Sequence, residues 1–213
     1  MKILLADDHA IVRRGLRQIL ADAFPEARFG EASTTPETLA ALECEPWDVL
    51  VLDIFMPGRT GLEVLQAVRS HRPGLPVLVV STAPEEQLAV RVLRGGAGGY
   101  LNKQAAPELL VQAIKHLRAG RKYVSPVLAE RLATDLSREV RPGHERLSDR
   151  EFAVLQLLLL GRTIKEIAAE LSLSAKTVST YHTRIWSKLG VHNDVELVHY
   201  ATSQGLSGIR NGT

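Results

Sequence analysis

The sequence predicts an α/β fold with a doubly wound parallel sheet, followed by a small domain built only of helices. Two observations indicate this. Within residues 1–120, short strand-like runs alternate with helical stretches, and runs such as DVLVLDI and PVLVVS are apolar on both faces, as buried parallel strands are. After Leu147 only helical periodicity is found. The alternation favours a sheet with helices on both faces, and 213 residues suffice for two separate cores.

Five strands alternating with five helices are expected in the first part. The strands are expected at Lys2–Ala6, Arg28–Ala32, Val49–Ile54, Val77–Ser81 and Gly99–Asn102, in the flavodoxin-like order 2-1-3-4-5. The helices are indicated by apolar residues at helical spacing, an N-cap with a following proline, a capping box, and a proline and a glycine at the two ends of the last helix. The residues at helical spacing are Ile11, Leu16, Ile19 and Leu20. The N-cap with its proline is Thr35 with Pro36, and the capping box is Thr60 with Glu63. Pro107 and Gly120 mark the two ends of the last helix.

The second part has helix signals only. Ser125 and Pro126 start a short helix, and residues 137–146 have the charges, proline and glycine of a linker. Later helix starts and stops follow the usual capping rules. The starts are Ser148 with Glu151, Thr163 with Glu166, Ser174, and Asn193 or Asp194, and the stops are Gly161 and Gly190. We therefore expect a domain at 1–120, a linker with a short helix at 121–146 and a helical domain at 147–213.

Composition limits the environment and the partners. No apolar segment approaches the roughly 20 residues that cross a bilayer, and the acidic start of the chain does not fit a signal peptide. The single cysteine, Cys44, permits no internal disulfide, which suits a reducing cytoplasm. Residues 1–120 contain 13 Lys and Arg and 14 Asp and Glu. From Arg121 onward there are 13 Lys and Arg but only 10 Asp and Glu, so the second part is the more basic one. We expect a cytoplasmic protein without a membrane partner, whose second part tolerates a polyanion.

Polar and charged side chains follow the strands at the ends where such sheets form their sites. They are Asp7 and Asp8 after the first strand, Asp53 after the third, Ser81 after the fourth and Lys103 after the fifth. Three converging carboxylates need a cation, and a hard divalent ion such as Mg²⁺ prefers oxygen ligands. The hydroxyl and the ammonium group complete a cradle for a phosphoryl group, which Asp53 is placed to attack.

The segment 163–189 has the pattern of a helix, a tight turn and a second helix. One side of the second helix is apolar, and the other is polar, cationic and free of acids from Ser174 to Gly190. Such a face fits the major groove of DNA. The candidates for base edges are Ser179, Thr180 and Thr183, and those for phosphates are Thr163, Lys165, Lys176, Arg184 and Lys188. Short hydroxyl side chains read bases weakly, so affinity should depend on phosphates and on the pairing of two subunits.

These motifs occur in the order and spacing of a known family. The segments LLADDH, VLVLDIFMPGRTGLEVL, LPVLVVSTA and GAGGYLNK resemble the receiver domain of bacterial two-component response regulators. The later segment is similar to the LuxR-type helix-turn-helix; it reads LSDREFAVLQLLLLGRTIKEIAAELSLSAKTVSTYHTRIWSKLGVHNDVELVHYA. Together they cover nearly all of the chain, which resembles the NarL/FixJ family of response regulators.

The resemblance implies a role for each site residue. Asp53 is the phosphoacceptor; Asp7, Asp8, Asp53 and the backbone carbonyl of Phe55 bind Mg²⁺; Ser81 hydrogen-bonds the phosphoryl group; Lys103 pairs with it; Tyr100 turns inward when Ser81 moves. Phosphorylation by a sensor histidine kinase would control homodimerisation and sequence-specific binding to double-stranded DNA. RNA polymerase is a further candidate partner. The implied function is regulation of transcription, not catalysis.

Two other functions are compatible with parts of the sequence. The receiver-like part could be a protein-interaction module that works without phosphorylation, which incubation with a small phosphodonor and Mg²⁺ would test. An aspartyl-phosphate hydrolase would also attack through Asp53, but it needs an acid two residues later, where Phe55 stands. The chain departs from the receiver pattern in two places: Gln104 stands where many receivers have proline, and Phe55 is bulkier and more apolar than the polar residue often found at its position. No chemical group of the site is lost by either departure.

Three residues have alternative interpretations. His9, beside the acidic pair, is either an exposed loop histidine or a ligand or phosphodonor. Val195 and Val198 in the last helix are either core residues or a surface through which two subunits pair.

Overall fold

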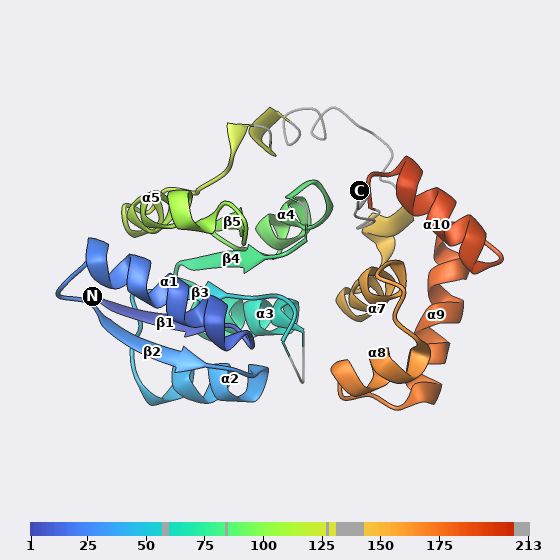
Figure 1. Ribbon diagram of the computed structural model, residues 1–213, viewed down its shortest axis with the longest axis horizontal. Coiled ribbons are helices and arrows are strands. Elements are labelled where there is room, and N and C mark those ends of the chain that lie inside the picture. The colour runs from blue at the N-terminus through green and yellow to red at the C-terminus, as the bar shows by residue number, and fades with distance from the viewer. Residues whose placement is uncertain (57–59, 84, 127, 131–142, 207–213) are drawn as a thin grey trace. The chain divides into compact units, whose positions relative to one another are not determined.

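The computed structural model describes residues 1–56, 60–83, 85–126, 128–130 and 143–206. The chain divides into two compact units, Met1–Leu132 and Ala133–Thr213. Among the described residues, no helix is long and apolar enough to cross a membrane. The first unit is the α/β domain and the second is built of helices (Figure 1).

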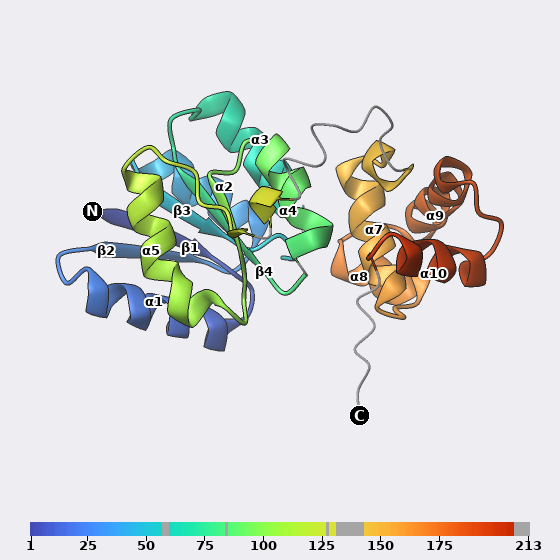
Figure 2. The same ribbon diagram turned by 90° about the horizontal axis from the view of Figure 1, so that it is seen from above.

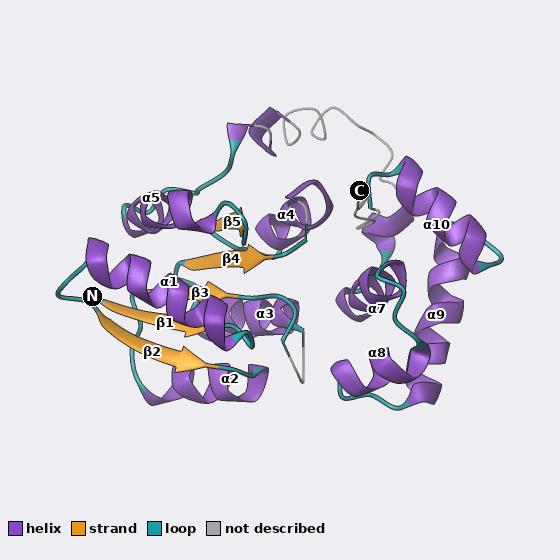
Figure 3. Cartoon of the chain, in the orientation of Figure 1, coloured by secondary structure: helices purple, strands orange, loops and turns teal. Residues whose placement is uncertain are grey.

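The sheet of the first unit has the predicted strands and order. They are β1 (Lys2–Ala6), β2 (Arg28–Ala32), β3 (Val49–Leu52), β4 (Val77–Ser81) and β5 (Gly99–Asn102). All neighbours pair in parallel in the order β2-β1-β3-β4-β5, which confirms the doubly wound topology (Figure 3). The third strand ends at Leu52, two residues earlier than expected. Asp53 therefore lies just beyond the sheet, where its N–H donates to the carbonyl of Ala6 at 2.8 Å.

Helices cover both faces of this sheet. One face is covered by α1 (Ala10–Ala23) and α5 (Ala106–Arg118), and the other by α2 (Thr35–Cys44), α3 (Gly61–His71) and α4 (Glu85–Arg94) (Figure 2). Under α1 and α5 the buried apolar side chains of β1, β3 and β4 form a continuous core. Burying a leucine or isoleucine there contributes about 1.5–3 kcal/mol. Ile11 does not join this core: its side chain is 87% exposed on the first turn of α1.

Two predicted caps of this unit differ in the structure. The N-cap of α2 is Thr34, whose hydroxyl accepts the N–H of Glu37, so Thr35 is the first helical residue. Either threonine can precede Pro36, and the sequence does not separate them. Thr60 is the N-cap of α3, but its buried hydroxyl makes no capping hydrogen bond. Gly61 lies too close to Asp53 for a side chain, since an added Cβ would be 2.4 Å from the Asp53 carbonyl oxygen.

The residues that follow α5 bind the outer edge of β5. Tyr123 pairs in parallel with Gly99, and its N–H donates to the carbonyl of Gly98 at 2.9 Å. Ser125 donates its hydroxyl to Glu85 at 2.7 Å, and the side chain of Leu128 is buried. The first part of the expected linker is therefore attached to the α/β unit. Residues 127 and 131–136 of the short helix expected after Ser125, and residues 137–142 of the linker, lie outside the described residues.

The described part of the second unit begins with a 3-10 turn, Gly143–Arg146, and continues with α7 (Asp149–Leu159), α8 (Ile164–Glu170), α9 (Ala175–Leu189) and α10 (Asp194–Ser203). Both predicted capping boxes are present, at Ser148 with Glu151 and at Thr163 with Glu166. Ser174 caps α9 and Asn193 caps α10. Gly190 ends α9 in the left-handed conformation, with φ of 70°. Helices α8 and α9 form the predicted helix-turn-helix.

Candidate functional site: an acidic pocket and a helix-turn-helix

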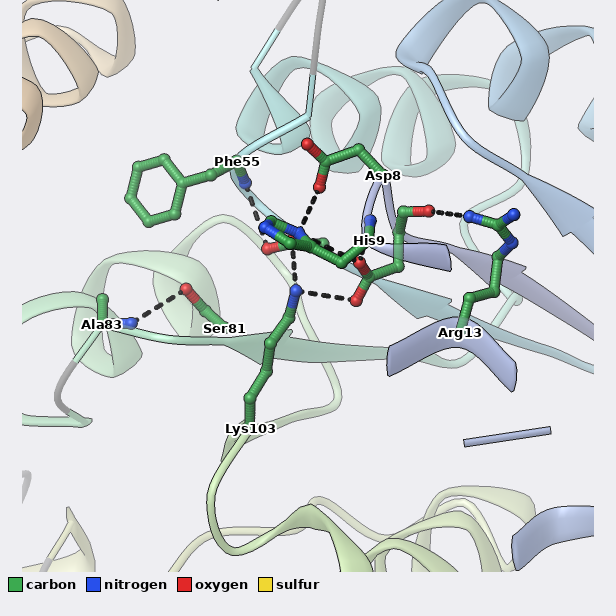
Figure 4. Close-up of polar contacts among 9 residues, drawn as sticks. Asp8, His9, Arg13, Phe55, Ser81, Ala83 and Lys103 are labelled. Atoms are coloured by element: carbon green, nitrogen blue, oxygen red, sulfur yellow. Dashed lines mark hydrogen bonds and ion pairs between the residues drawn. The ribbon is translucent and has the colours of Figure 1, made fainter. Parts of the chain in front are cut away.

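The side chains of Asp53, Asp7 and Lys103 meet beyond the carboxyl ends of β1, β3 and β5. Figure 4 labels Lys103, and dashed lines mark its contacts with the two carboxylates. Lys103 places its Nζ 2.7 Å from Asp53 Oδ2 and 2.7 Å from Asp7 Oδ2. The other oxygen of Asp53 accepts the N–H of Phe55 at 3.1 Å. Both aspartates are buried. The sequence placed these three groups together correctly because parallel strands end at one edge of the sheet.

Asp8 and His9 complete the acidic side of the pocket. The potential ligand atoms of Asp7, Asp8, His9 and Asp53 lie within 4.8 Å of one another. Asp7 Oδ2 and Asp8 Oδ1 are buried and accept no hydrogen bond of ordinary geometry, although each lies 2.7 Å from a nitrogen, Lys103 Nζ and His9 Nδ1 respectively. Three carboxylates that converge this closely suit a divalent cation with oxygen ligands, so the residues fit a hard metal ion.

Ser81 and Tyr100 lie on the β4 and β5 side. The Ser81 hydroxyl accepts the N–H of Ala83 at 3.2 Å, which leaves its proton free to donate. Tyr100 is buried and donates its hydroxyl to the carbonyl of Ala83 at 2.5 Å. Asn102 donates to the same carbonyl at 3.0 Å. The loop after β4 therefore joins the predicted phosphoryl ligand to the predicted switch residue through Ala83, which sequence reasoning did not single out.

Arg13 is a second residue that sequence reasoning missed. Its Nη1 donates to the carbonyl of Asp7 at 2.6 Å, and its Nε donates to Glu31 at 2.9 Å. It thereby fixes the main chain between the two candidate metal ligands Asp7 and Asp8. No motif marks it, because the contact is to a backbone oxygen.

Phe55 does not fill the pocket. Figure 4 shows its ring directed away from the carboxylates, while its backbone N–H points to Asp53. The peptide bond after Lys103 is trans, since the described residues contain no cis peptide bond, and the N–H of Gln104 donates to the side chain of Asn102 at 2.9 Å. Asn102 thus orders this loop where many receivers use proline.

Burial dominates the electrostatics of Asp53. It raises the pKa of this carboxyl to about 6, with a further contribution from the charge of Asp7, against the lowering effect of Lys103. Burial lowers the pKa of Lys103, but the charges of Asp53 and Asp7 and the hydrogen bond to Asp53 raise it above the ordinary value overall. Lys103 is therefore positively charged at neutral pH. Asp53 is also mostly ionised there, but its pKa is closer to neutral than that of an ordinary aspartate.

This shift predicts a pH dependence of stability in metal-free protein. The folded chain holds the Asp53 proton more tightly than the unfolded chain, so the contribution of Asp53 to the free energy of unfolding falls as pH rises from about 4 to about 6. The term amounts to about 1–3 kcal/mol. Asparagine does not titrate, so the free energy of unfolding of Asp53→Asn should rise relative to that of wild type as pH increases over this range. Urea unfolding in EDTA measures this difference. A difference between the two proteins that is independent of pH would contradict the shift.

The DNA candidates lie in the second unit, and all eight are exposed. On α9, Thr180 and Thr183 donate their hydroxyls to the carbonyls of Lys176 and Ser179, four residues earlier. Each hydroxyl oxygen is left as an acceptor, which suits the amino groups of adenine or cytosine. The apolar side of the helix packs inward through the buried residues Val178 and Ile185. The predicted division of the helix into a packed face and an outward polar face is what the structure has.

Two more of the eight are engaged within the unit through acidic side chains. Thr163 exchanges hydrogen bonds with Glu166 in the capping box of α8. Lys188 lies 2.5 Å from Glu151, whose side chain is only 3% exposed. A contact from Lys188 to a phosphate would have to compete with this ion pair. Nothing in the sequence marks the pair, because 37 positions separate its members.

The comparisons with known proteins agree with this description. The family model for the response regulator receiver domain matches residues 3–115, and that for bacterial regulatory proteins of the luxR family matches residues 145–201. The chain is 34% identical to the response regulator UvrY of Escherichia coli over 211 residues, which cover 97% of this chain and 95% of that protein. It is 35% identical to the response regulator GacA of Pseudomonas aeruginosa over 209 residues, which cover 97% of each.

Solved structures give the same result. RcsB from Salmonella enterica serovar Typhimurium, bound to the promoter rprA in the presence of the phosphomimetic BeF3−, has a TM-score of 0.67 at 30% identity, covering 95% of this chain and 99% of that one. Another structure of Salmonella RcsB has a TM-score of 0.73 at 30% identity, covering 96% and 98%.

A receiver fold with an acidic pocket, joined to a LuxR-type helix-turn-helix, defines a response regulator that binds DNA and regulates transcription. The chain belongs to the NarL/FixJ family of two-component response regulators.

Proposed function

We propose that a sensor histidine kinase phosphorylates Asp53 and that this modification controls dimerisation and sequence-specific DNA binding. The observation that supports it best is the setting of Asp53. Its carboxylate is buried at the end of β3, its Oδ2 is paired with Lys103, and Asp7 and Asp8 lie beside it. The pKa of Asp53 is raised toward neutral, and a lysine lies against its carboxylate. Such a carboxylate is suited to attack an electrophilic phosphorus atom.

In the proposed reaction an oxygen of Asp53 forms a bond to phosphorus, and the phosphorus–nitrogen bond of a phosphohistidine breaks with the electron pair going to nitrogen. Lys103 neutralises charge on the phosphoryl oxygens as it moves from its present position between Asp53 and Asp7. Asp7, Asp8, Asp53 and the carbonyl of Phe55 would hold Mg²⁺, which supplies further charge neutralisation. The Ser81 hydroxyl, whose proton is free, donates to the phosphoryl group.

The loop after β4 would pass this event on. When Ser81 turns to the phosphoryl group it gives up the N–H of Ala83, and the carbonyl of Ala83 is the acceptor for Tyr100. Tyr100 would then change its partner or its rotamer. The same loop leads to α4, whose Glu85 holds Ser125. Phosphorylation is thereby linked to the segment that leads to the DNA-binding unit.

Dimerisation is proposed to use α10. Val195 is 68% exposed and Val198 is 38% exposed, so neither is a core residue of the described unit. A pair of subunits would double the phosphate contacts that the short side chains of α9 require. RcsB, which is similar to this chain, has been solved as dimers bound to DNA.

The decisive experiment measures binding to a genomic fragment pool by the full chain, with and without acetyl phosphate and Mg²⁺. We expect enrichment of specific fragments only after phosphorylation. Equal enrichment in both samples would favour the alternative in which the receiver domain is an interaction module that works without phosphorylation.

The DNA face makes a separate prediction. Lys176→Ala should weaken binding to all sequences and reduce the salt dependence by about one phosphate contact, because a long cation reaches the backbone. Thr180→Ala should cost about 1–3 kcal/mol on the preferred site only, relaxing selection at one base pair. The two half-sites of a dimer should recur about 10 base pairs apart. Binding selection with the three proteins tests this, and an unaltered preference in Thr180→Ala would place another face in the groove.

A further inference from the structure

His9 occupies the N-cap of α1 without capping it. The side chain of an N-cap residue normally accepts an N–H of the first turn, and serine, threonine, aspartate and asparagine do so best. The side chain of His9 makes no such bond. Its backbone is fixed on both sides, because its N–H donates to Asp7 Oδ1 at 2.8 Å and its carbonyl accepts the N–H of Arg13 at 2.9 Å. The backbone of His9 is therefore held in place, and its imidazole does not cap the helix.

The imidazole instead faces the acidic pocket (Figure 4). Its Nδ1 lies 2.7 Å from Asp8 Oδ1 and 3.5 Å from Asp7 Oδ1. Lys103 contacts the other oxygen of Asp7, Oδ2, so the nitrogen of His9 and the ammonium of Lys103 approach Asp7 through different oxygens. Asp7 is buried, its Oδ2 lacks an ordinary hydrogen bond, and it points into this cluster.

The ligand atoms are close enough for one ion. Two ligand atoms of an ion with bonds of about 2.1 Å lie at most about 4.2 Å apart. The atoms of Asp7, Asp8, His9 and Asp53 lie within 4.8 Å of one another, so small side-chain rotations would bring them into one coordination sphere.

We infer that His9 is a metal ligand that determines selectivity, so that the pocket binds ions which accept imidazole, such as Co²⁺, Ni²⁺ and Zn²⁺, in addition to Mg²⁺. Mg²⁺ prefers oxygen ligands and gains little from an imidazole, whereas these transition ions bind nitrogen well. His9 would thus raise the affinity for one class of ion and leave the other unchanged. The inference rests on the proposed metal site at Asp7, Asp8 and Asp53.

His9→Asn is the informative variant. Asparagine is a favoured N-cap, so α1 should fold at least as well, while the imidazole nitrogen is lost. The full chain is titrated with CoCl₂ and, separately, with MgCl₂ by calorimetry, and the Co²⁺ titration is repeated with saturating Mg²⁺ to identify the shared pocket. We expect the dissociation constant of Co²⁺ to rise at least about tenfold and that of Mg²⁺ to change less than about twofold. His71→Asn, an exposed histidine on α3, is the matched control and should change neither constant.

Two results would overturn the inference. If His9→Asn leaves Co²⁺ binding unchanged, the imidazole is not a ligand. If it weakens Co²⁺ and Mg²⁺ by the same factor, His9 acts only on the shape of the loop. Mg²⁺-dependent labelling of Asp53 separates this inference from the proposed function. If Asp53 is labelled in both wild type and His9→Asn, the proposed function stands, whatever the Co²⁺ titration shows. If wild type is not labelled, the proposed function is rejected, but the inference about Co²⁺ binding by His9 is not.

Discussion

Asp53→Asn is expected to take up no phosphoryl group from acetyl phosphate in the presence of Mg²⁺. The amide has no anionic oxygen to attack phosphorus, and no other acid in the pocket occupies the position between Lys103 and the N–H of Phe55. Labelling is measured by the mass of the intact protein and by the hydroxylamine sensitivity of the added group. Because dimerisation is proposed to follow phosphorylation, the variant should also keep one oligomeric state with or without the phosphodonor.

Asp22→Asn is a suitable control, because Asp22 is an exposed carboxylate on α1, away from the strand ends. It should be labelled like wild type. Labelling that survives in Asp53→Asn would show that a different residue is the phosphoacceptor, and mapping the modified peptide would identify it.

Glu151→Ala is expected to destabilise the second unit strongly. Glu151 is buried, caps α7 through Ser148 and pairs with Lys188 at the end of α9. Burial raises its pKa, but the hydrogen bonds from Lys188 and Ser148 lower it overall, so the stabilisation is present near neutral pH and is lost as pH falls through the acidic range. Breaking this pair should lower the free energy of unfolding by about 2–4 kcal/mol, since Lys188 is partly exposed and screened.

Glu166→Ala provides the matched comparison. Glu166 has the same capping-box position in α8, but it is exposed and has no lysine partner at the C-terminus of α9. Its loss should destabilise the unit much less. Urea unfolding can be followed by Trp186 in a Trp47→Phe background, because the chain has two tryptophans and Trp47 belongs to the first unit. Equal losses in the two variants would mean that the capping box, and not the buried ion pair, provides the stability.

The strand-end residues of the pocket could be predicted because their positions follow from the alternation of strands and helices. Asp7, Asp53, Ser81 and Lys103 each follow a short apolar run, and a parallel sheet brings the ends of such runs together. The same reasoning could not find Arg13 or Ala83, which act through backbone oxygens. It also could not find Glu151 and Lys188, whose contact depends on how α7 and α9 pack.

Local signals failed where two neighbours satisfy the same rule or where burial depends on neighbours distant in sequence. By sequence, Thr34 and Thr35 are equally good N-cap candidates. Only the structure, in which the helix begins at Thr35, identifies Thr34 as the cap. Ile11 fits the apolar period of α1, yet it lies on the first turn, beyond the core that covers Leu16 and Leu20.

The pairing of Tyr123 with Gly99 has a consequence for how the first unit behaves in isolation. The strand β5 ends the sheet, and an open terminal strand offers unpaired N–H and C=O groups to a second molecule. A fragment that stops at Gly120 keeps α5 but exposes this backbone, so it should self-associate in a concentration-dependent way. A fragment extended through Leu128 should stay monodisperse at the same concentration. The smallest fragment of the first unit that stays monodisperse should therefore be set by the segment that pairs with the last strand, and not by the end of the last helix.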